Sequence, residues 1–295
     1  MAKRSPRSLN GRVVAITGGA RGIGKATARS LVREGAKVAI GDLDVDLAQK
    51  TATELGGGTI ALELNVTDRS SFEGFLAQVE EQVGPLDVIV NNAGIMPIGP
   101  FIDETDATAM RMIDINLHGV IFGTKLALPG MLRRGSGHIV NIASQAGKGG
   151  FPGGATYCAT KHAVVGMSEA VRGETRNTGV EISCVMPAIV NTELTAGMTE
   201  ARGVKNIEPE DVAEAIVSAL KVPKFDVYVP GYGGGILKVM SLLPRAAREG
   251  LSRALRADRV LMDFDPAKRA AYERRAAQSE PGLEPEAVAE EAKTS

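Results

Sequence analysis

A tyrosine and a lysine four positions apart are the side chains of this sequence best suited to moving a proton. They occupy the segment Tyr157-Cys158-Ala159-Thr160-Lys161, and on a helix residues four apart lie on one face. A free tyrosine has a pKa of about 10, and a neighbouring cation favours its phenolate form. Tyr157 is therefore a candidate proton donor or acceptor, although such a pair can also be two exposed polar residues on a helix.

A glycine-rich segment far upstream has the composition of a phosphate-binding loop. It reads Thr17-Gly18-Gly19-Ala20-Arg21-Gly22-Ile23-Gly24 and stands between an apolar run and an amphipathic one. A loop of this kind lets backbone N–H groups approach a pyrophosphate at the N-terminus of a helix. The spacing of Gly18, Gly22 and Gly24 differs from the commonest dinucleotide fingerprint, so a tight strand–helix turn is the alternative.

An acidic residue follows where a dinucleotide's ribose needs one. Asp42 closes the next apolar run, near the offset of about 20 residues expected for an acid that hydrogen-bonds ribose hydroxyls. Its carboxylate repels a 2′-phosphate, which favours NAD over NADP. Arg21 favours NADP instead, because a guanidinium can pair with a 2′-phosphate. Asp44 is a rival for the role of Asp42, but we expect it to start the following helix.

These residues need a scaffold, and the hydropathy pattern predicts one in which strands and helices alternate. Nearly continuous apolar runs alternate with amphipathic segments, which is typical of a parallel sheet covered by helices on both faces. The predicted fold class is α/β, a doubly wound, seven-stranded, Rossmann-like sheet followed by a helical extension. The expected strands are 13–16, 37–41, 59–64, 86–90, 138–142, 180–185 and 226–229, and the expected helices are 23–34, 45–55, 69–83, 107–134, 157–178 and 209–220.

Composition divides the chain of 295 residues into four parts. These are a flexible basic tail (1–9), a nucleotide-binding catalytic domain (10–235) ending in a flexible glycine run, an amphipathic helical extension (236–277) and an acidic tail expected to be disordered (278–295). The net charge of −1 lacks the positive excess that is typical of nucleic-acid-binding proteins. We predict a cytoplasmic location. The sequence has only two cysteines, and it shows no signal peptide and no apolar run of about 18 residues.

Taken in order, these motifs resemble the short-chain dehydrogenase/reductase family over about residues 10–230. The glycine segment matches its cofactor loop, Asn91-Asn92-Ala93-Gly94 its NNAG motif, and Asn116, Ser144, Tyr157 and Lys161 its catalytic tetrad. The resemblance implies that Tyr157 is the general acid/base and that Ser144 stabilises the substrate oxygen. It further implies that Lys161 binds the nicotinamide ribose and lowers the pKa of Tyr157, while Asn116 holds a water of the proton relay.

The resemblance also implies how the cofactor is held and how the chain assembles. Thr192, which follows Pro187 beyond the sixth strand, would hold the nicotinamide carboxamide. A homodimer or homotetramer is expected, and no metal site is predicted. The predicted cofactor-binding residues are Gly18, Ala20, Arg21, Gly22, Ile23, Gly24, Asp42, Leu43, Asn65, Val66, Asn92, Ala93, Gly94, Tyr157, Lys161, Pro187, Ile189, Val190 and Thr192.

Three positions depart from the family's pattern. Ala143 precedes Ser144 where a second serine is common, with little consequence expected for mechanism. Asn65 stands where an aspartate usually contacts adenine, and its amide is expected to hydrogen-bond the adenine amino group, with weaker binding. Ala188 follows Pro187 where glycine is usual, and we expect this difference to shift the loop beside the nicotinamide.

The segments that form the family's substrate pocket are mostly apolar here, which favours a lipophilic secondary alcohol or ketone of steroid, retinoid or fatty type. The alternatives are an NADP-dependent carbonyl reductase and a catalytically silent, cofactor-sensing protein on the same fold. Residues 236–256 predict an amphipathic helix interrupted at Pro244, with arginines opposite its leucines. Such a stretch packs on its own fold or a partner subunit, or it makes a peripheral contact with an anionic membrane surface. In each case it can cap the substrate entrance.

Overall fold

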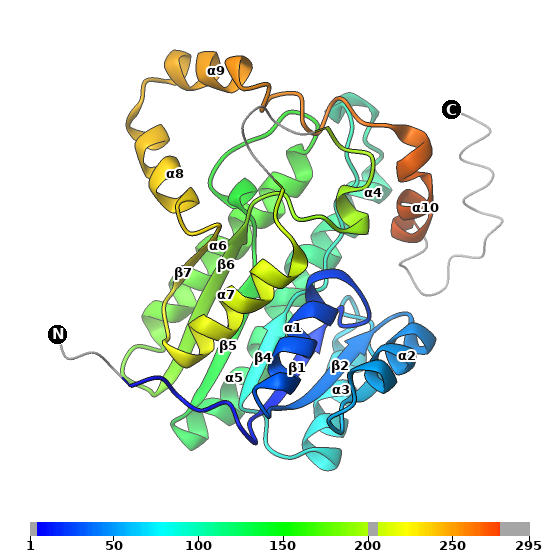
Figure 1. The fold of residues 1–295 in the computed structure, drawn as a ribbon, viewed down its shortest axis with the longest axis vertical. Helices are drawn as coiled ribbons and strands as arrows, with labels where there is room; N and C mark the ends of the chain where they lie inside the picture. Colours follow the sequence, from blue (N-terminus) through cyan, green and yellow to red (C-terminus); the bar gives the residue numbers. More distant parts are fainter. Residues whose placement is uncertain (1–4, 200–205, 278–295) are drawn as a thin grey trace.

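The computed structural model describes residues 5–199 and 206–277 as one sheet enclosed by helices (Figure 1). Seven parallel strands lie in the order β3-β2-β1-β4-β5-β6-β7, which confirms the predicted doubly wound α/β fold. The predicted acidic tail lies outside the described residues. The strands are β1 Val13–Thr17, β2 Lys37–Asp42, β3 Ile60–Glu63, β4 Val88–Asn91, β5 Gly137–Ile142, β6 Val180–Pro187 and β7 Asp226–Val229.

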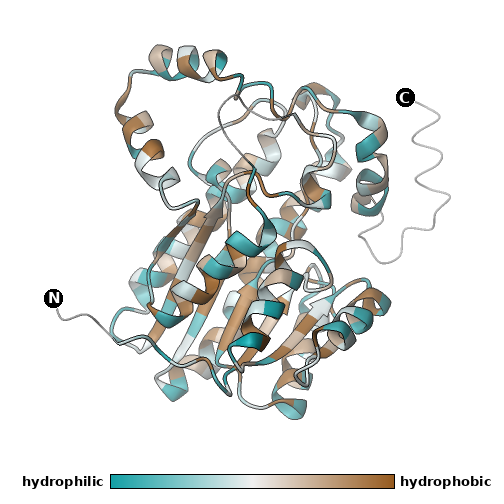
Figure 2. Ribbon diagram, viewed as in Figure 1, coloured by the Kyte–Doolittle hydropathy of each residue, from teal (hydrophilic) through white to brown (hydrophobic). Residues whose placement is uncertain are grey.

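Helices cover both faces of this sheet, and apolar residues concentrate in the strands between them (Figure 2). Helices α1, α2 and α7 share one core with the sheet, and α3, α5 and α6 pack on the other face. The helices are α1 Gly22–Arg33, α2 Val45–Leu55, α3 Arg69–Gln82, α4 Asp106–Ile113, α5 Gly119–Arg134, α6 Ala155–Glu174, α7 Pro209–Lys221, α8 Gly233–Leu242, α9 Arg245–Ala254 and α10 Pro266–Ala277.

The central strand β1 shows how one run of apolar residues builds both cores. All five of its residues are buried, and successive side chains point to opposite faces of the sheet. Val13 and Ala15 belong to the core formed with α3 and α5, whereas Val14 and Ile16 belong to the core formed with α1 and α7. A strand buried on both faces needs an unbroken apolar sequence.

The strand order places a crevice at the carboxyl ends of β1 and β4. The chain runs outward from β1 to β3 and then returns to β4 on the other side of β1. The connections after β1 and β4 therefore leave in opposite directions, and open α/β sheets bind ligands at such a point. Most of the predicted cofactor residues lie at or just after the carboxyl ends of β1, β2, β3, β4 and β6.

The predicted helix 107–134 is interrupted by an irregular turn. It comprises α4, a π-helical turn at Asp114–His118 and α5 in one continuous run. Single π turns are rare in helices and are frequent at functional sites. Asn116 lies within this turn and is fully buried.

Beyond β7 the chain forms three helices. The glycines 233–235, expected to be flexible, form the first turn of α8, and Pro244 separates α8 from α9 as predicted. These two helices project from the body of the protein, whereas α10 returns to it (Figure 1). Within the described ranges, no helix is long and apolar enough to cross a membrane.

Candidate active site

The glycine-rich segment forms a tight turn between β1 and α1. Gly18 and Gly22 have φ values of +63° and +52°, which residues with a side chain rarely adopt. A Cβ atom on Gly24 would lie 2.1 Å from the carbonyl oxygen of Gly18. The turn therefore offers bare backbone at the N-terminus of α1, an arrangement suited to a pyrophosphate.

The segment after β4 holds this turn in place. The side-chain nitrogen of Asn92 donates to the carbonyl oxygens of Thr17 and Gly18, at 2.9 and 3.0 Å. In return, the Thr17 hydroxyl accepts hydrogen bonds from the backbone N–H groups of Asn92 and Ala93. Asn92 and Ala93, predicted to bind the cofactor, thus also shape the loop that would do so.

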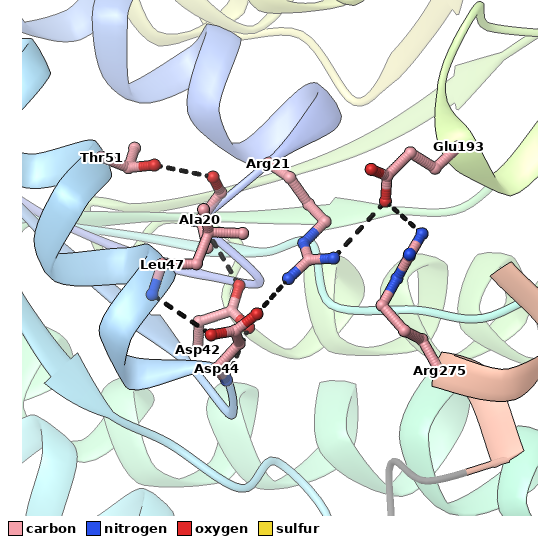
Figure 3. Close-up of polar contacts among 8 residues, drawn as sticks. All are labelled: Ala20, Arg21, Asp42, Asp44, Leu47, Thr51, Glu193 and Arg275. Carbon is pink, nitrogen blue, oxygen red and sulfur yellow. Dashed lines mark hydrogen bonds and ion pairs between the residues drawn. The ribbon is translucent and has the colours of Figure 1, made fainter. Parts of the chain in front are cut away.

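Asp42 ends β2 beside the glycine turn (Figure 3). Its carboxylate accepts hydrogen bonds from the backbone N–H groups of Ala20 at 3.0 Å and Asp44 at 3.2 Å. Burial raises the pKa of Asp42, while these two donors and the charge of Arg21 oppose the rise. Asp44 caps α2 by accepting from the N–H of Leu47, as expected. The two acids therefore have different tasks, and Asp42 is the one fixed at the strand end.

Arg21 is held by carboxylates on two sides (Figure 3). Its guanidinium lies 2.5 Å from Asp44 and 3.4 Å from Glu193, two acids that follow β2 and β6 respectively. Glu193 also pairs with Arg275 of α10, at 2.6 Å. The cation that could have served a 2′-phosphate is therefore already paired with acidic groups of the protein itself.

Asn65 is held by local hydrogen bonds just after β3. Its side-chain oxygen accepts from both the backbone N–H and the hydroxyl of Thr67, at 3.1 and 2.8 Å. The oxygen that would accept from the adenine amino group therefore already has two donors. The contact with adenine stays a prediction. Nearby, Val66 is buried against Gly119, and Leu43 is partly exposed.

Three of the four predicted catalytic side chains meet in one cavity. Ser144, just after β5, and Tyr157 and Lys161, on α6, all line it. Ser144 and Tyr157 are hydrogen-bonded to each other. The ammonium of Lys161 lies 5.7 Å from the centre of the Tyr157 ring and donates to the carbonyl oxygen of Ile142 at 3.0 Å. The structure therefore places Ser144, which follows β5, beside the two catalytic side chains of α6.

Asn116 does not line this cavity but holds its framework. Its amide oxygen accepts from the N–H of Ile95, and its amide nitrogen donates to the carbonyl of the same residue, both at 2.8 Å. The nitrogen also lies 3.3 Å from the hydroxyl of Thr160, which is between the two catalytic residues on α6. Asn116 thus links the segment after the NNAG motif to α6, and its role in holding a water stays a prediction.

Burial controls the protonation of Tyr157 and Lys161. It raises the pKa of Tyr157 to about 12, against the opposing hydrogen bond from Ser144, and it lowers the pKa of Lys161 to about 8. The cost of desolvating the phenolate is the largest cause of this rise, so Tyr157 is protonated at neutral pH. That Lys161 lowers the pKa of Tyr157, as the resemblance implies, stays a prediction.

The residues predicted beside the nicotinamide follow β6 on the wall of the same cavity. Ala188, where glycine was usual, does not adopt a positive φ, and its N–H donates to the carbonyl of Val229 at 2.7 Å. An alanine is therefore accommodated here without backbone strain. The cavity lining includes Pro187, Ile189, Val190 and Thr192, together with Ile23, Asn92 and Gly94 from the cofactor side.

The cavity measures about 1020 Å³ and has two unlike walls. The inner wall consists of the sheet edge, α6 and the loops around Met96 and Phe151. The outer wall consists of α8, α9 and residues 255–261, so the extension borders the cavity, in keeping with the prediction that it can cap the substrate entrance. Its apolar members include Leu237, Met240, Leu251 and Leu261, and its cations are Arg245, Arg248 and Arg253.

Helix α10 adds a second feature that sequence analysis missed. Arg269 is fully buried and donates to the carbonyl oxygens of Leu194, at 2.9 Å, and Met96. The hydroxyl of Tyr272 accepts from the N–H of Met96 at 2.6 Å, and Arg269 pairs with Glu273 at 2.5 Å. We call Arg269 and Tyr272 the α10 clasp. It joins two loops that line the cavity, and nothing local distinguishes Arg269 from the other arginines of this segment.

Other reactive side chains have structural partners. Cys158 and Cys184 are buried free thiols. His138 is hydrogen-bonded to Ser183 at 2.9 Å, and burial lowers its pKa to about 3. Over residues 5–199 and 206–277, no group of three or more histidine, cysteine or acidic residues could hold a metal ion.

A family model and relatives from several organisms match this chain. The model, described as short chain dehydrogenase, matches residues 12–203. Sorbitol dehydrogenase of Cereibacter sphaeroides is 37% identical over 63% of this chain and 73% of its own length. 17-beta-hydroxysteroid dehydrogenase 13 of Mus musculus is 32% identical over 78% of this chain and 77% of its own. Glycine betaine reductase ATRR of Emericella nidulans is 35% identical over 73% of this chain, which spans only 18% of that protein.

A solved structure has the same fold. The crystal structure of a short chain dehydrogenase/reductase from Burkholderia phymatum in complex with NAD superposes with a TM-score of 0.74 and 23% identity, covering 80% of this chain and 94% of that one. At this identity the likeness concerns the fold alone. The relatives' names span a polyol, a steroid and a betaine, so they do not single out one substrate class.

Proposed function

We propose that this chain, which belongs to the short-chain dehydrogenase family, is an NAD-dependent oxidoreductase. It interconverts a lipophilic secondary alcohol and its ketone. The observation that carries the proposal is the meeting of Ser144, Tyr157 and Lys161 in a largely apolar cavity. A proton donor, a hydrogen-bonding hydroxyl and a buried cation are the groups needed beside an oxygen that gains or loses a proton.

The residues of the crevice fit a dinucleotide. The close approach of Gly18 and Gly24 leaves backbone free for a pyrophosphate at the N-terminus of α1. Asp42 would accept hydrogen bonds from the adenosine ribose hydroxyls. Its carboxylate, and the pairing of Arg21 with Asp44, disfavour a 2′-phosphate and so support NAD. When bound, the nicotinamide supplies or accepts the hydride.

Each polar residue of the inner wall then has a defined task. Tyr157 donates its proton to the ketone oxygen during reduction and takes up the alcohol proton during oxidation. Because burial raises its pKa to about 12, it holds that proton at neutral pH. Ser144 donates its own hydrogen bond to the same oxygen. Lys161 supplies the positive charge that favours the phenolate, which oxidation requires.

The cavity supports a lipophilic substrate. Most of its accessible lining is apolar, with Met96, Phe151 and Leu194 on the inner wall and Leu251 and Leu261 on the outer one. Binding sites for small molecules are commonly apolar with a few placed polar groups, and their volumes reach about 1,000 Å³. A ring system or chain of steroid or fatty size suits such a volume better than a small polyol does.

Turnover of the purified full chain tests this proposal. NAD with a lipophilic secondary alcohol should yield NADH, and NADH with the matching ketone should be consumed. Sorbitol is the polar comparison, since it offers the same functional group without apolar surface. Oxidation of sorbitol with no turnover of any lipophilic alcohol would overturn the substrate class. Cofactor binding without turnover of either kind would overturn the assignment as an enzyme.

A further inference from the structure

Helices α8 and α9 are unusual because, beyond Gly233 and Gly234 in the first turn of α8, neither helix has a buried residue. No residue between 235 and 259 is buried, and none of the residues of α9 is. Each helix has 10 residues, and isolated helices shorter than about 12–15 residues are marginal in water. Helices of this length owe most of their stability to packing of an apolar face. Residues 235–259, here called the arm, therefore lack the surface that would stabilise them.

One side of α8 carries the apolar face that such a surface would cover. Ile236, Val239 and Leu242 are 55%, 61% and 84% exposed, and their spacing of three places them along one side of the helix. Figure 2 shows that this helix, which projects from the body of the protein, contains strongly apolar residues. Exposed apolar residues gathered on one element mark an interaction site more often than single ones do.

The charge of this region indicates what the face meets. Residues 236–262 contain six basic side chains (Lys238, Arg245, Arg248, Arg253, Arg256, Arg259) and two acidic ones (Glu249, Asp258), a net charge of +4 (6 − 2). The whole chain has a net charge of −1, so the positive charge is local. Apolar side chains next to clustered arginines are the pattern of a helix that lies in the interface of an anionic bilayer.

We propose that the arm docks on an anionic membrane surface. Ile236, Val239 and Leu242 enter the boundary between headgroups and acyl chains, and the arginines of α9 pair with lipid phosphates. A second copy of the chain fits less well, because a symmetric contact would place a charge of +4 against an identical +4. Docking does not depend on the proposed reaction. If that reaction also holds, the outer wall of the substrate cavity faces the lipid, and a lipophilic substrate has a direct route from the bilayer.

Vesicle sedimentation of the full chain tests this proposal. We expect the protein to sediment with phosphatidylcholine vesicles that contain phosphatidylglycerol, and to do so less at high salt. Val239→Asp with Leu242→Asp should weaken binding at least about tenfold, because each places a charge in the acyl boundary. Arg248→Gln and Arg253→Gln should each weaken it about fivefold, since one basic residue near such a surface contributes about that factor.

Matched controls lie at the opposite ends of the strands. Leu132 is exposed beside Arg133 at the end of α5, just before β5 begins, whereas the arm follows the carboxyl end of β7. Leu132→Asp and Arg133→Gln should leave vesicle binding unchanged. Circular dichroism and NADH binding check that every variant is folded, independently of turnover.

Two results would overturn the proposal. One is that the wild-type protein stays in the supernatant with anionic vesicles, or that the control variants lose as much vesicle binding as the arm variants do. The other is a self-associated form, seen by light scattering without lipid, that Val239→Asp with Leu242→Asp dissociates; the arm would then be a subunit interface.

Discussion

The two walls of the cavity are built in opposite ways. The inner wall holds Tyr157 and Lys161 on α6, both buried and packed against the sheet. The outer wall consists mostly of the arm, in which no residue is buried; only Val260 and Leu261, which follow the arm, are buried. The arm connects to the body through β7 at one end and through the segment leading to the α10 clasp at the other. Under the proposed function this difference separates two tasks: the buried wall fixes the reacting groups, and the exposed wall governs which molecules reach them.

The largest effect is expected from removing the proton donor of the inner wall. Tyr157→Phe should lower turnover by about 10²- to 10⁴-fold, the usual contribution of a positioned acid/base. NADH affinity should change little, because the ring remains. Tyr232→Phe, at an exposed tyrosine near the start of the arm, should keep full activity. Steady-state rates and calorimetry make this test, and survival of turnover in Tyr157→Phe would refute the assignment.

The protonation state of Tyr157 predicts different pH dependences for oxidation and reduction. Oxidation needs the phenolate of Tyr157, and burial raises the pKa of that group to about 12, so the reactive form increases as pH rises. Initial oxidation rates should therefore increase by up to about tenfold per pH unit from neutrality to about pH 8, above which Lys161 loses the charge that favours the phenolate, whereas reduction should not increase. An oxidation rate that is flat or falls from neutral to moderately alkaline pH would contradict the assigned role.

The α10 clasp should matter more for stability than any residue of the arm. Arg269→Met leaves the carbonyl oxygens of Leu194 and Met96 without their charged donor and should lower the free energy of unfolding by about 2–4 kcal/mol. Arg274→Met, on the exposed side of the same helix, should change it by less than about 0.5 kcal/mol. Urea unfolding measures both. Equal losses would mean that the clasp does not hold the loops.

The smallest effect is expected from trimming the outer wall. Leu251 lines the cavity yet is 41% exposed, so Leu251→Ala should raise KM for a lipophilic substrate about three- to tenfold and leave kcat unchanged. Leu132→Ala, at a residue of equal exposure outside the cavity, is the control. A fall in kcat with unchanged KM would show that the arm also positions the reacting groups.

The same contrast explains what the sequence could predict. β1 was predictable because its apolar run is continuous, and Tyr157 with Lys161 because a helix sets their spacing. The π turn was not predictable from local sequence, and Asn116 within it is held by two hydrogen bonds to Ile95, a residue outside the helix. The burial of Arg269 could not be predicted either, because its partners Leu194 and Met96 lie in loops far from it in sequence.

Calorimetric titration of the full chain with NADH and, separately, NADPH tests the central claim most directly. Asp42 at the ribose and Arg21 paired with Asp44 predict that NADH binds at least about tenfold more tightly, since a 2′-phosphate would face a carboxylate. Equal or tighter binding of NADPH would mean that Arg21 outweighs Asp42. Binding of neither would contradict the assignment of the crevice as a dinucleotide site.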